Sequence, residues 1–246
     1  MSSKDWFVDW FDTPYYHILY QNRNDLEAKK FIQTLMGHLK LPSSSKLLDL
    51  ACGKGRHSKT LNELGYDVLG VDLSENSINE AIRLSNDTLS FRVHDMREVL
   101  VGAKFDAIFN LFTSFGYFDS NKENERMCAS IAQMLLPNGK LIIDFMNAHK
   151  VIKYLVNEEK KEIDGIQFHI TRTYDNTHIE KHIKFNHKGK QYHFTERVQG
   201  LRLDDFKTLL APFFTIDQVF GSLDFQPFVL EKSDRLIIIA SRKNEL

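Results

Sequence analysis

The chain has 246 residues, of which 42% are hydrophobic and 26% are charged, as in an ordinary globular protein. Its 32 basic and 33 acidic side chains nearly cancel, so no overall positive field attracts it to nucleic acid or to an anionic membrane surface. The longest apolar runs have the length of strands, and Lys4, Asp5 and Asp9 interrupt the first apolar stretch, unlike in a signal peptide. We therefore expect a cytoplasmic protein with neither a nucleic-acid nor a membrane partner.

Residues 1–45 form the first predicted part of the chain, and its most distinctive stretch is "DWFVDWFDTPYYHILY" at residues 5–20. This N-terminal aromatic segment carries too many aromatic side chains for a solvated arm. We predict helices that pack against the rest of the fold, that cover a bound ligand as a lid, or that do both.

Residues 46–150 form the second part, in which apolar runs of strand length alternate with amphipathic helices. The predicted strands span 46–51, 67–72, 89–93, 105–112 and 140–146. Ser74 is a predicted helix cap, and Ser120 with Glu123 a predicted capping box. Alternating strands and helices indicate a mainly parallel sheet that is covered on both faces and binds its ligand beyond the carboxyl ends of the strands.

Residues 158–200 form the third part, a predicted antiparallel β insertion with strands over 161–175, 178–186 and 190–198. Five of the ten histidines lie here, but residues four apart on a strand are about 13 Å apart, too far to share a metal ion. The two cysteines of the chain form no metal or disulfide pattern either. We expect no metal site.

Residues 201–246 return to the α/β pattern, with a helix predicted around 203–211. The strands predicted over 213–220 and 234–242 are expected to pair as an antiparallel hairpin at one edge of the main sheet.

A glycine loop follows the first predicted strand. Gly53 and Gly55 permit positive φ and a close approach of the backbone to a ligand, and they open a helix whose first N–H groups favour an anion. Ser58 stands where the dinucleotide pattern G-x-G-x-x-G requires its third glycine, and no P-loop lysine follows. The loop therefore predicts an anion site that is neither a typical dinucleotide loop nor a P-loop.

Two acidic residues restrict the chemical class of the ligand further. Asp72 follows Gly53 by 19 residues at the end of the second strand, where a carboxylate accepts hydrogen bonds from ribose hydroxyls. Asp49 lies between Leu48 and Leu50 and needs a partner, which a cationic amine and the loop N–H groups would provide. A ligand with a ribose, an amine and a carboxylate fits this pattern, and S-adenosylmethionine is such a compound.

Residues 47–81, "LLDLACGKGRHSKTLNELGYDVLGVDLSENSINEA", closely resemble the first motifs of class I S-adenosylmethionine-dependent methyltransferases of the small-molecule type. The resemblance continues through "HDMRE" (94–98), "FDAIFNLFTSFGYF" (105–118) and "LLPNGKLIIDF" (135–145). It implies an α/β, Rossmann-like seven-stranded sheet of order 3-2-1-4-5-7-6 with a small antiparallel insertion.

The resemblance also implies site residues: Asp95 at the adenine amino group, Met96 on the ring, and residues 110–112 beneath the methionine portion. We predict cofactor-binding residues at Tyr16, Tyr20, Asp49, Ala51, Gly53, Gly55, Arg56, Asp72, Leu73, Asp95, Met96, Asn110, Leu111 and Phe112. The insertion is expected to roof the acceptor site, where the predicted substrate-binding residues are Tyr117, Arg172, Tyr174 and Arg197. For the last three, a solvated sheet face is the alternative.

The predicted function is methyl transfer from S-adenosylmethionine to an N or O atom of a small molecule. Because the sulfonium leaving group is already activated, no obligatory catalytic residue follows from the sequence. Two alternatives remain at this point: a nicotinamide-dependent oxidoreductase, and a non-catalytic module that binds S-adenosylmethionine. The sequence leaves the oligomeric state open.

Overall fold

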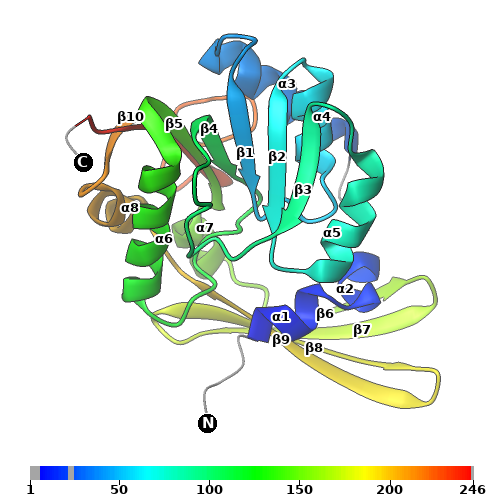
Figure 1. Ribbon diagram of the computed structural model, residues 1–246. Helices are drawn as coiled ribbons and strands as arrows, with labels where there is room; N and C mark the ends of the chain where they lie inside the picture. The colour runs from blue at the N-terminus through cyan, green and yellow to red at the C-terminus, as the bar shows by residue number, and fades with distance from the viewer. Residues whose placement is uncertain (1–5, 22–24, 245–246) are drawn as a thin grey trace.

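The computed structural model describes residues 6–21 and 25–244, and its centre is a seven-stranded sheet (Figure 1). The strand order is β10-β11-β5-β4-β1-β2-β3. Only β11 runs antiparallel to its neighbours, β5 and β10. The bounds are β1 Lys46–Leu50, β2 Asp67–Asp72, β3 Leu89–Val93, β4 Phe105–Asn110, β5 Leu135–Met146, β10 Phe214–Phe220 and β11 Arg235–Arg242. This arrangement confirms the predicted order 3-2-1-4-5-7-6 and the terminal antiparallel pair.

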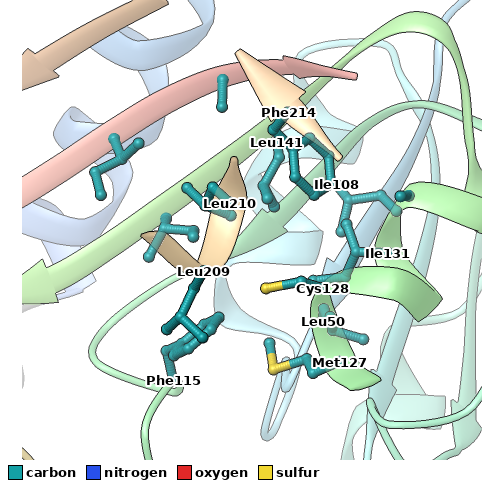
Figure 2. Close-up of a cluster of buried hydrophobic side chains, with 14 of the residues drawn as sticks. Leu50, Ile108, Phe115, Met127, Cys128, Ile131, Leu141, Leu209, Leu210 and Phe214 are labelled. Carbon is teal, nitrogen blue, oxygen red and sulfur yellow. The ribbon is translucent and has the colours of Figure 1, made fainter. Parts of the chain in front are cut away.

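Helices cover both faces of the sheet, because the apolar side chains of each buried strand alternate between two cores. Leu48 and Leu50 pack with α6 and α8, whereas Leu47 packs with α3, α4 and α5. Figure 2 shows the first core around Leu50, Met127 and the neighbouring side chains of α6, α8 and the sheet. These helices span α3 Asp25–Leu39, α4 Arg56–Glu63, α5 Glu75–Ala81, α6 Asn121–Met134 and α8 Leu203–Leu210, and a 3₁₀ turn, η1 Ile82–Leu84, extends α5.

After the short helix α7 (Ala148–Lys153), the chain forms a separate four-stranded antiparallel sheet. Its strands are β6 Glu158–Ile163, β7 Ile166–Tyr174, β8 His178–His187 and β9 Lys190–Gln199. The single strand predicted over 161–175 is wrong. Asp164 and Gly165 have φ of 49° and 74° and form a tight turn, so β6 and β7 pair as a hairpin.

The N-terminal aromatic segment forms α1 (Trp6–Phe11) and α2 (Pro14–Leu19), which lie on the insertion sheet near the carboxyl ends of the central strands (Figure 1). Trp10 is 1% exposed and packs with Phe168 and Phe185 of the insertion. Phe7 packs instead with the central core, so the segment joins the two sheets. The first residue of the segment lies outside the described residues.

Two local predictions differ from the structure. The strand predicted over 105–112 ends at Asn110, because Phe112 and Thr113 turn into the left-handed region. In the predicted capping box, the hydroxyl of Ser120 donates to the carboxylate of Glu123 instead of accepting from the helix backbone. Within the described residues, no helix combines the length and apolar character needed to cross a bilayer.

Candidate functional site

A cavity of about 780 Å³ lies beyond the carboxyl ends of β1, β2 and β4. Its walls come from the glycine loop, from the segments that follow β2, β3 and β4, and from α1 and α2. This is the position where doubly wound sheets bind their ligands, and the volume falls in the range of small-molecule sites.

The glycine loop bends sharply after β1. Ala51, Gly53 and Gly55 have φ of 65°, 56° and 80°. A Cβ added to Gly53 would meet no atom within 4 Å, so this glycine leaves open space in the cavity wall. A Cβ added to Gly55 would come within 2.7 Å of the Phe91 ring, so Gly55 permits close packing of the loop against β3.

Asp72 lies at the end of β2 and lines the cavity. Its carboxylate accepts hydrogen bonds from the backbone N–H groups of Gly53, at 2.8 Å, and Ser74, at 2.9 Å. Burial raises the pKa of Asp72, against the opposing effect of these N–H groups. Each carboxylate oxygen keeps a lone pair for a further donor, so the group is placed to accept two hydroxyls of a ligand.

Asp49 is 1% exposed and lies behind the loop, outside the cavity wall. The hydroxyl of Ser58 donates to it at 2.6 Å. Burial raises the pKa of Asp49 to about 6, although the hydrogen bond from Ser58 opposes the rise. Ser58, which departs from the dinucleotide pattern, thus supplies a hydrogen bond that a glycine would lack.

Asp95 and Met96 follow β3 and line the cavity. Arg97 donates to both carboxylate oxygens of Asp95, at 3.0 Å from Nε and 2.7 Å from Nη2, and also pairs with Glu123. Burial disfavours the Asp95 carboxylate, but the hydrogen bonds and the charge of Arg97 outweigh burial and lower its pKa. Asp95 is therefore an ionised acceptor at the edge of the cavity.

Phe112 lies in the cavity wall just after β4. The guanidinium of Arg56 lies 5.0 Å from the centre of its ring, and the ring of His57 lies 5.5 Å away. Phe11 also lines the cavity, and the centre of its ring lies 4.9 Å from that of Tyr16 and 5.2 Å from that of Tyr117. Aromatic faces of this kind attract a cation.

Tyr20 also lines the cavity, but its hydroxyl donates at 2.7 Å to the carboxylate of Glu196 in β9. The indole of Trp10 donates to the same carboxylate at 2.7 Å, and the ammonium of Lys181 lies 3.3 Å from it. Burial lowers the pKa of Lys181, while Glu196 opposes the shift. This polar cluster joins the N-terminal helices to the insertion.

The structure brings eleven of the fourteen predicted cofactor-binding residues and one predicted substrate residue to the cavity wall: Tyr16, Tyr20, Ala51, Gly53, Arg56, Asp72, Leu73, Asp95, Met96, Leu111, Phe112 and Tyr117. Asp49, Gly55 and Asn110 lie behind the wall. The amide of Asn110, which is fully buried, donates to the carbonyl of Leu50 at 3.2 Å and joins β4 to β1.

Three predicted substrate residues lie away from the cavity. Arg172 pairs with Glu159 at 2.6 Å, the hydroxyl of Tyr174 donates to a neighbouring turn carbonyl, and Arg197 pairs with Glu180 at 3.0 Å. Among the histidines of the insertion, the ring of His169 lies 2.8 Å from Glu158, and the rings of His182 and His193 lie 5.6 Å apart.

Several residues that line the cavity are not among the site residues predicted from the sequence. These include Phe7, Phe11, His17, Ser114 and Phe118. The aromatic richness of residues 5–20 was the available signal for Phe7 and Phe11. Nothing in the local sequence indicated that Ser114 and Phe118, which follow β4, turn toward this cavity.

Comparisons with known proteins agree with this geometry. Residues 47–139 match the model of a family described as "Methyltransferase domain". The chain is 36% identical over 104 residues to dTDP-3-amino-3,4,6-trideoxy-alpha-D-glucopyranose N,N-dimethyltransferase of Streptomyces venezuelae, covering 42% of this chain and 43% of the relative. It is 30% identical over 159 residues to a glycine/sarcosine N-methyltransferase of Halorhodospira halochloris, covering 61% of this chain and 55% of the relative.

Residues 47–139 therefore form a methyltransferase domain by similarity to that family. The matches span about half the length of these curated relatives. The fold matches a solved S-adenosylmethionine-dependent methyltransferase of Clostridium acetobutylicum with a TM-score of 0.80 at 17% identity, covering 94% of this chain and 96% of the other. The structure of DesVI of Streptomyces venezuelae matches with a TM-score of 0.65 at 22% identity, covering 92% and 95%.

S-adenosylmethionine is the methyl donor of the class I methyltransferases that residues 47–139 resemble, and the residues of the methyltransferase domain fit it. Asp72 has acceptor capacity for both ribose hydroxyls, and Gly53 leaves open space beside it. The nicotinamide alternative conflicts with the strand order, because an antiparallel β11 lies between β5 and β10 instead of the parallel order 3-2-1-4-5-6.

Proposed function

We propose that this protein transfers a methyl group from S-adenosylmethionine to a nitrogen atom of a small-molecule amine. The observation that carries the proposal is one cavity whose lining combines Gly53 and Asp72 with the aromatic rings of Phe11, Tyr16 and Phe112. The first group suits an adenosyl amino acid, and the second suits cationic centres such as a sulfonium and a methylated ammonium.

In this proposal different residues of the site bind different parts of the cofactor. Asp72 accepts from the ribose hydroxyls, Asp95 from the adenine amino group, and Met96 packs on the adenine ring. The N–H groups at the start of α4 face the carboxylate of the methionine portion, and Asp49 balances its ammonium from behind the loop. When bound, S-adenosylmethionine supplies an activated methyl group.

The contribution of the protein to the reaction is position and exclusion of water. The helices α1 and α2 cover the cavity and are tied to the insertion through Glu196. In this proposal they hold the acceptor against the aromatic rings that line the cavity, which include Phe11 and Phe112. A neutral amine attacks without prior loss of a proton, so this reaction places no demand for a strong base on the cavity.

Two observations favour nitrogen over oxygen as the atom that accepts the methyl group. The relative from Streptomyces venezuelae is named as an N,N-dimethyltransferase of an amino sugar, and the relative from Halorhodospira halochloris as a glycine/sarcosine N-methyltransferase. The cavity wall is rich in aromatic faces, which stabilise the cationic product of N-methylation. We also propose that the chain divides into four functional parts. These are an N-terminal cover (1–45), a cofactor-binding core (46–150), a cap (158–200) and a C-terminal part of the core (201–246).

The test is turnover on a panel of amines. The protein is incubated with S-adenosylmethionine and nucleotide-linked amino sugars, glycine, sarcosine or simple hydroxy compounds, and both S-adenosylhomocysteine and methylated product are measured by mass spectrometry. The proposal predicts stoichiometric N-methylated product with at least one amine. Cofactor binding with no product from the entire panel would instead favour a non-catalytic binding module, and product from hydroxy compounds alone would contradict the nitrogen assignment.

A further inference from the structure

A strained turn carries Phe112 into the cavity wall. Phe112 and Thr113 have φ of 60° and 62°, so two successive residues with side chains adopt the left-handed conformation. This conformation is unfavourable for residues other than glycine, and most of all for a β-branched residue such as Thr113. Such a turn persists only where surrounding groups hold it.

Asp144, near the end of β5, supplies those groups. Its carboxylate accepts the N–H of Phe112 at 3.0 Å, and its backbone carbonyl accepts the N–H of Thr113 at 2.8 Å. One residue thus receives both N–H groups of the strained pair. The side chain is fully buried, so this acceptor is fixed in place by the packing around it.

Arg235, the first residue of β11, completes the arrangement. Its Nε donates to the other carboxylate oxygen of Asp144 at 2.7 Å, which balances the buried charge. Its guanidinium lies 5.7 Å from the centre of the Phe112 ring, while that of Arg56 lies 5.0 Å from the same centre. The ring therefore has two cationic neighbours in addition to its backbone restraint.

We propose that the buried Asp144–Arg235 pair is a positioning device that holds the Phe112–Thr113 turn in its left-handed form and thereby places Phe112 against the reacting end of the cofactor. Neither residue lines the cavity, so both act through Phe112. The inference rests on the proposed methyl transfer, which requires the methyl group and the acceptor to be aligned closely.

The experiment compares Asp144→Asn with wild type for kcat and for the Kd of S-adenosylhomocysteine. We expect kcat to fall by about tenfold or more, because a displacement of about 1 Å at the reacting atoms costs up to about 100-fold. The Kd should change by less than about threefold, because the ribose and carboxylate contacts are made elsewhere. A general structural defect would weaken both together, and an unchanged kcat would overturn the proposal.

A rescue variant isolates the role of the turn. Thr113→Gly removes the steric penalty of the left-handed conformation, so the Asp144→Asn/Thr113→Gly protein should recover most of the kcat lost by Asp144→Asn alone. It should also recover thermal stability in the absence of any ligand, which tests the inference even where no acceptor has been found. No recovery in either measurement contradicts a device that acts through the turn.

The matched control is Asp217→Asn. Asp217 pairs with Lys140 at 2.9 Å and joins strands of the same sheet at its other end, away from the cavity. This variant should keep wild-type kcat and gain nothing from Thr113→Gly. If Asp144→Asn does not fold, Arg235→Met serves in its place with the same expectations. A wild-type protein without turnover would refute the proposed function, whereas an active wild type with unaffected variants would refute this inference alone.

Discussion

The variant Asp49→Asn tests whether the buried charge of Asp49 lowers the stability of the protein while it strengthens cofactor binding. Asp49 is 1% exposed, and burial raises its pKa to about 6 from an ordinary value of 3.8. In the folded protein without ligand, the carboxyl therefore holds its proton to a higher pH than in the unfolded chain. Asparagine keeps the shape and an acceptor for Ser58 but carries no charge.

The sign of the pH dependence follows from proton binding. Between about pH 4 and about pH 6 the folded wild type binds a proton at Asp49 that the unfolded chain releases, so its free energy of unfolding falls as pH rises. The difference between the two pKa values corresponds to at most about 3 kcal/mol, all of it lost above about pH 6. Asp49→Asn lacks this loss, so its stability relative to wild type should rise by up to about 3 kcal/mol across this interval.

The assay is urea denaturation of both proteins, freed of cofactor, at a series of pH values from about 4 to about 8. Other titrating groups are present in both proteins, so the difference between the two curves reports mainly on Asp49. At neutral pH the variant should bind S-adenosylmethionine about tenfold more weakly, since the ammonium loses its counter-charge. Parallel pH curves for the two proteins, or a variant that loses stability relative to wild type as pH rises, would refute the reasoning.

Three further predictions concern the fold around the site. Gly55→Ala should lower the free energy of unfolding by about 2 kcal/mol or more, because its φ is 80° and the new Cβ would lie 2.7 Å from Phe91; thermal denaturation measures this. Glu196→Ala leaves the partly buried ammonium of Lys181 without its carboxylate and should cost about 3 kcal/mol, with faster proteolysis of the N-terminal helices. Tyr20→Phe removes one donor to Glu196 and should cost about 1–2 kcal/mol in thermal stability.

Two of these predictions, those for Gly55→Ala and Tyr20→Phe, have a matched comparison. Gly65→Ala introduces a side chain at a φ of 96° with no atom within 4 Å, so it should cost less than Gly55→Ala. Equal losses for the two would show that the contact with Phe91 is unimportant. For Tyr20→Phe, the comparison is Tyr16→Phe, which should leave the polar cluster around Glu196 intact; equal stability losses would mean that the Tyr20 hydroxyl has no special role.

Much of the central sheet was predictable because its signals are local. The strands over 67–72 and 89–93 have the predicted bounds, since each is a short apolar run between clear breakers. The β6–β7 hairpin was missed although the Asp164–Gly165 pair is a strong turn signal, because the apolar alternation continues on both sides of the turn.

The candidate site likewise has features that could be predicted from the sequence and features that could not. The glycine loop and Asp72 were predictable, because both lie at fixed spacing within one β-α-β unit. The end of β4 was not, because the N–H of Phe112 donates to Asp144, which lies 32 residues further along the chain. Arg172 and Arg197 were assigned to the acceptor because of their charge and the expected position of the insertion over the site, and the structure places them in ion pairs on the insertion. Pairing across strands is a tertiary property that composition does not reveal.

The central claim is that the cavity beside Asp72 binds an adenosyl amino acid. Isothermal titration calorimetry with S-adenosylhomocysteine and with NAD, on wild type, Asp72→Asn and Asp67→Asn, tests it most directly. Asp67 lies at the opposite end of β2 and is exposed, so Asp67→Asn is the control. We predict saturable binding of S-adenosylhomocysteine alone, unchanged in Asp67→Asn and weakened about tenfold or more in Asp72→Asn. Absence of binding by well-folded wild type, or equal binding of NAD, would contradict the account.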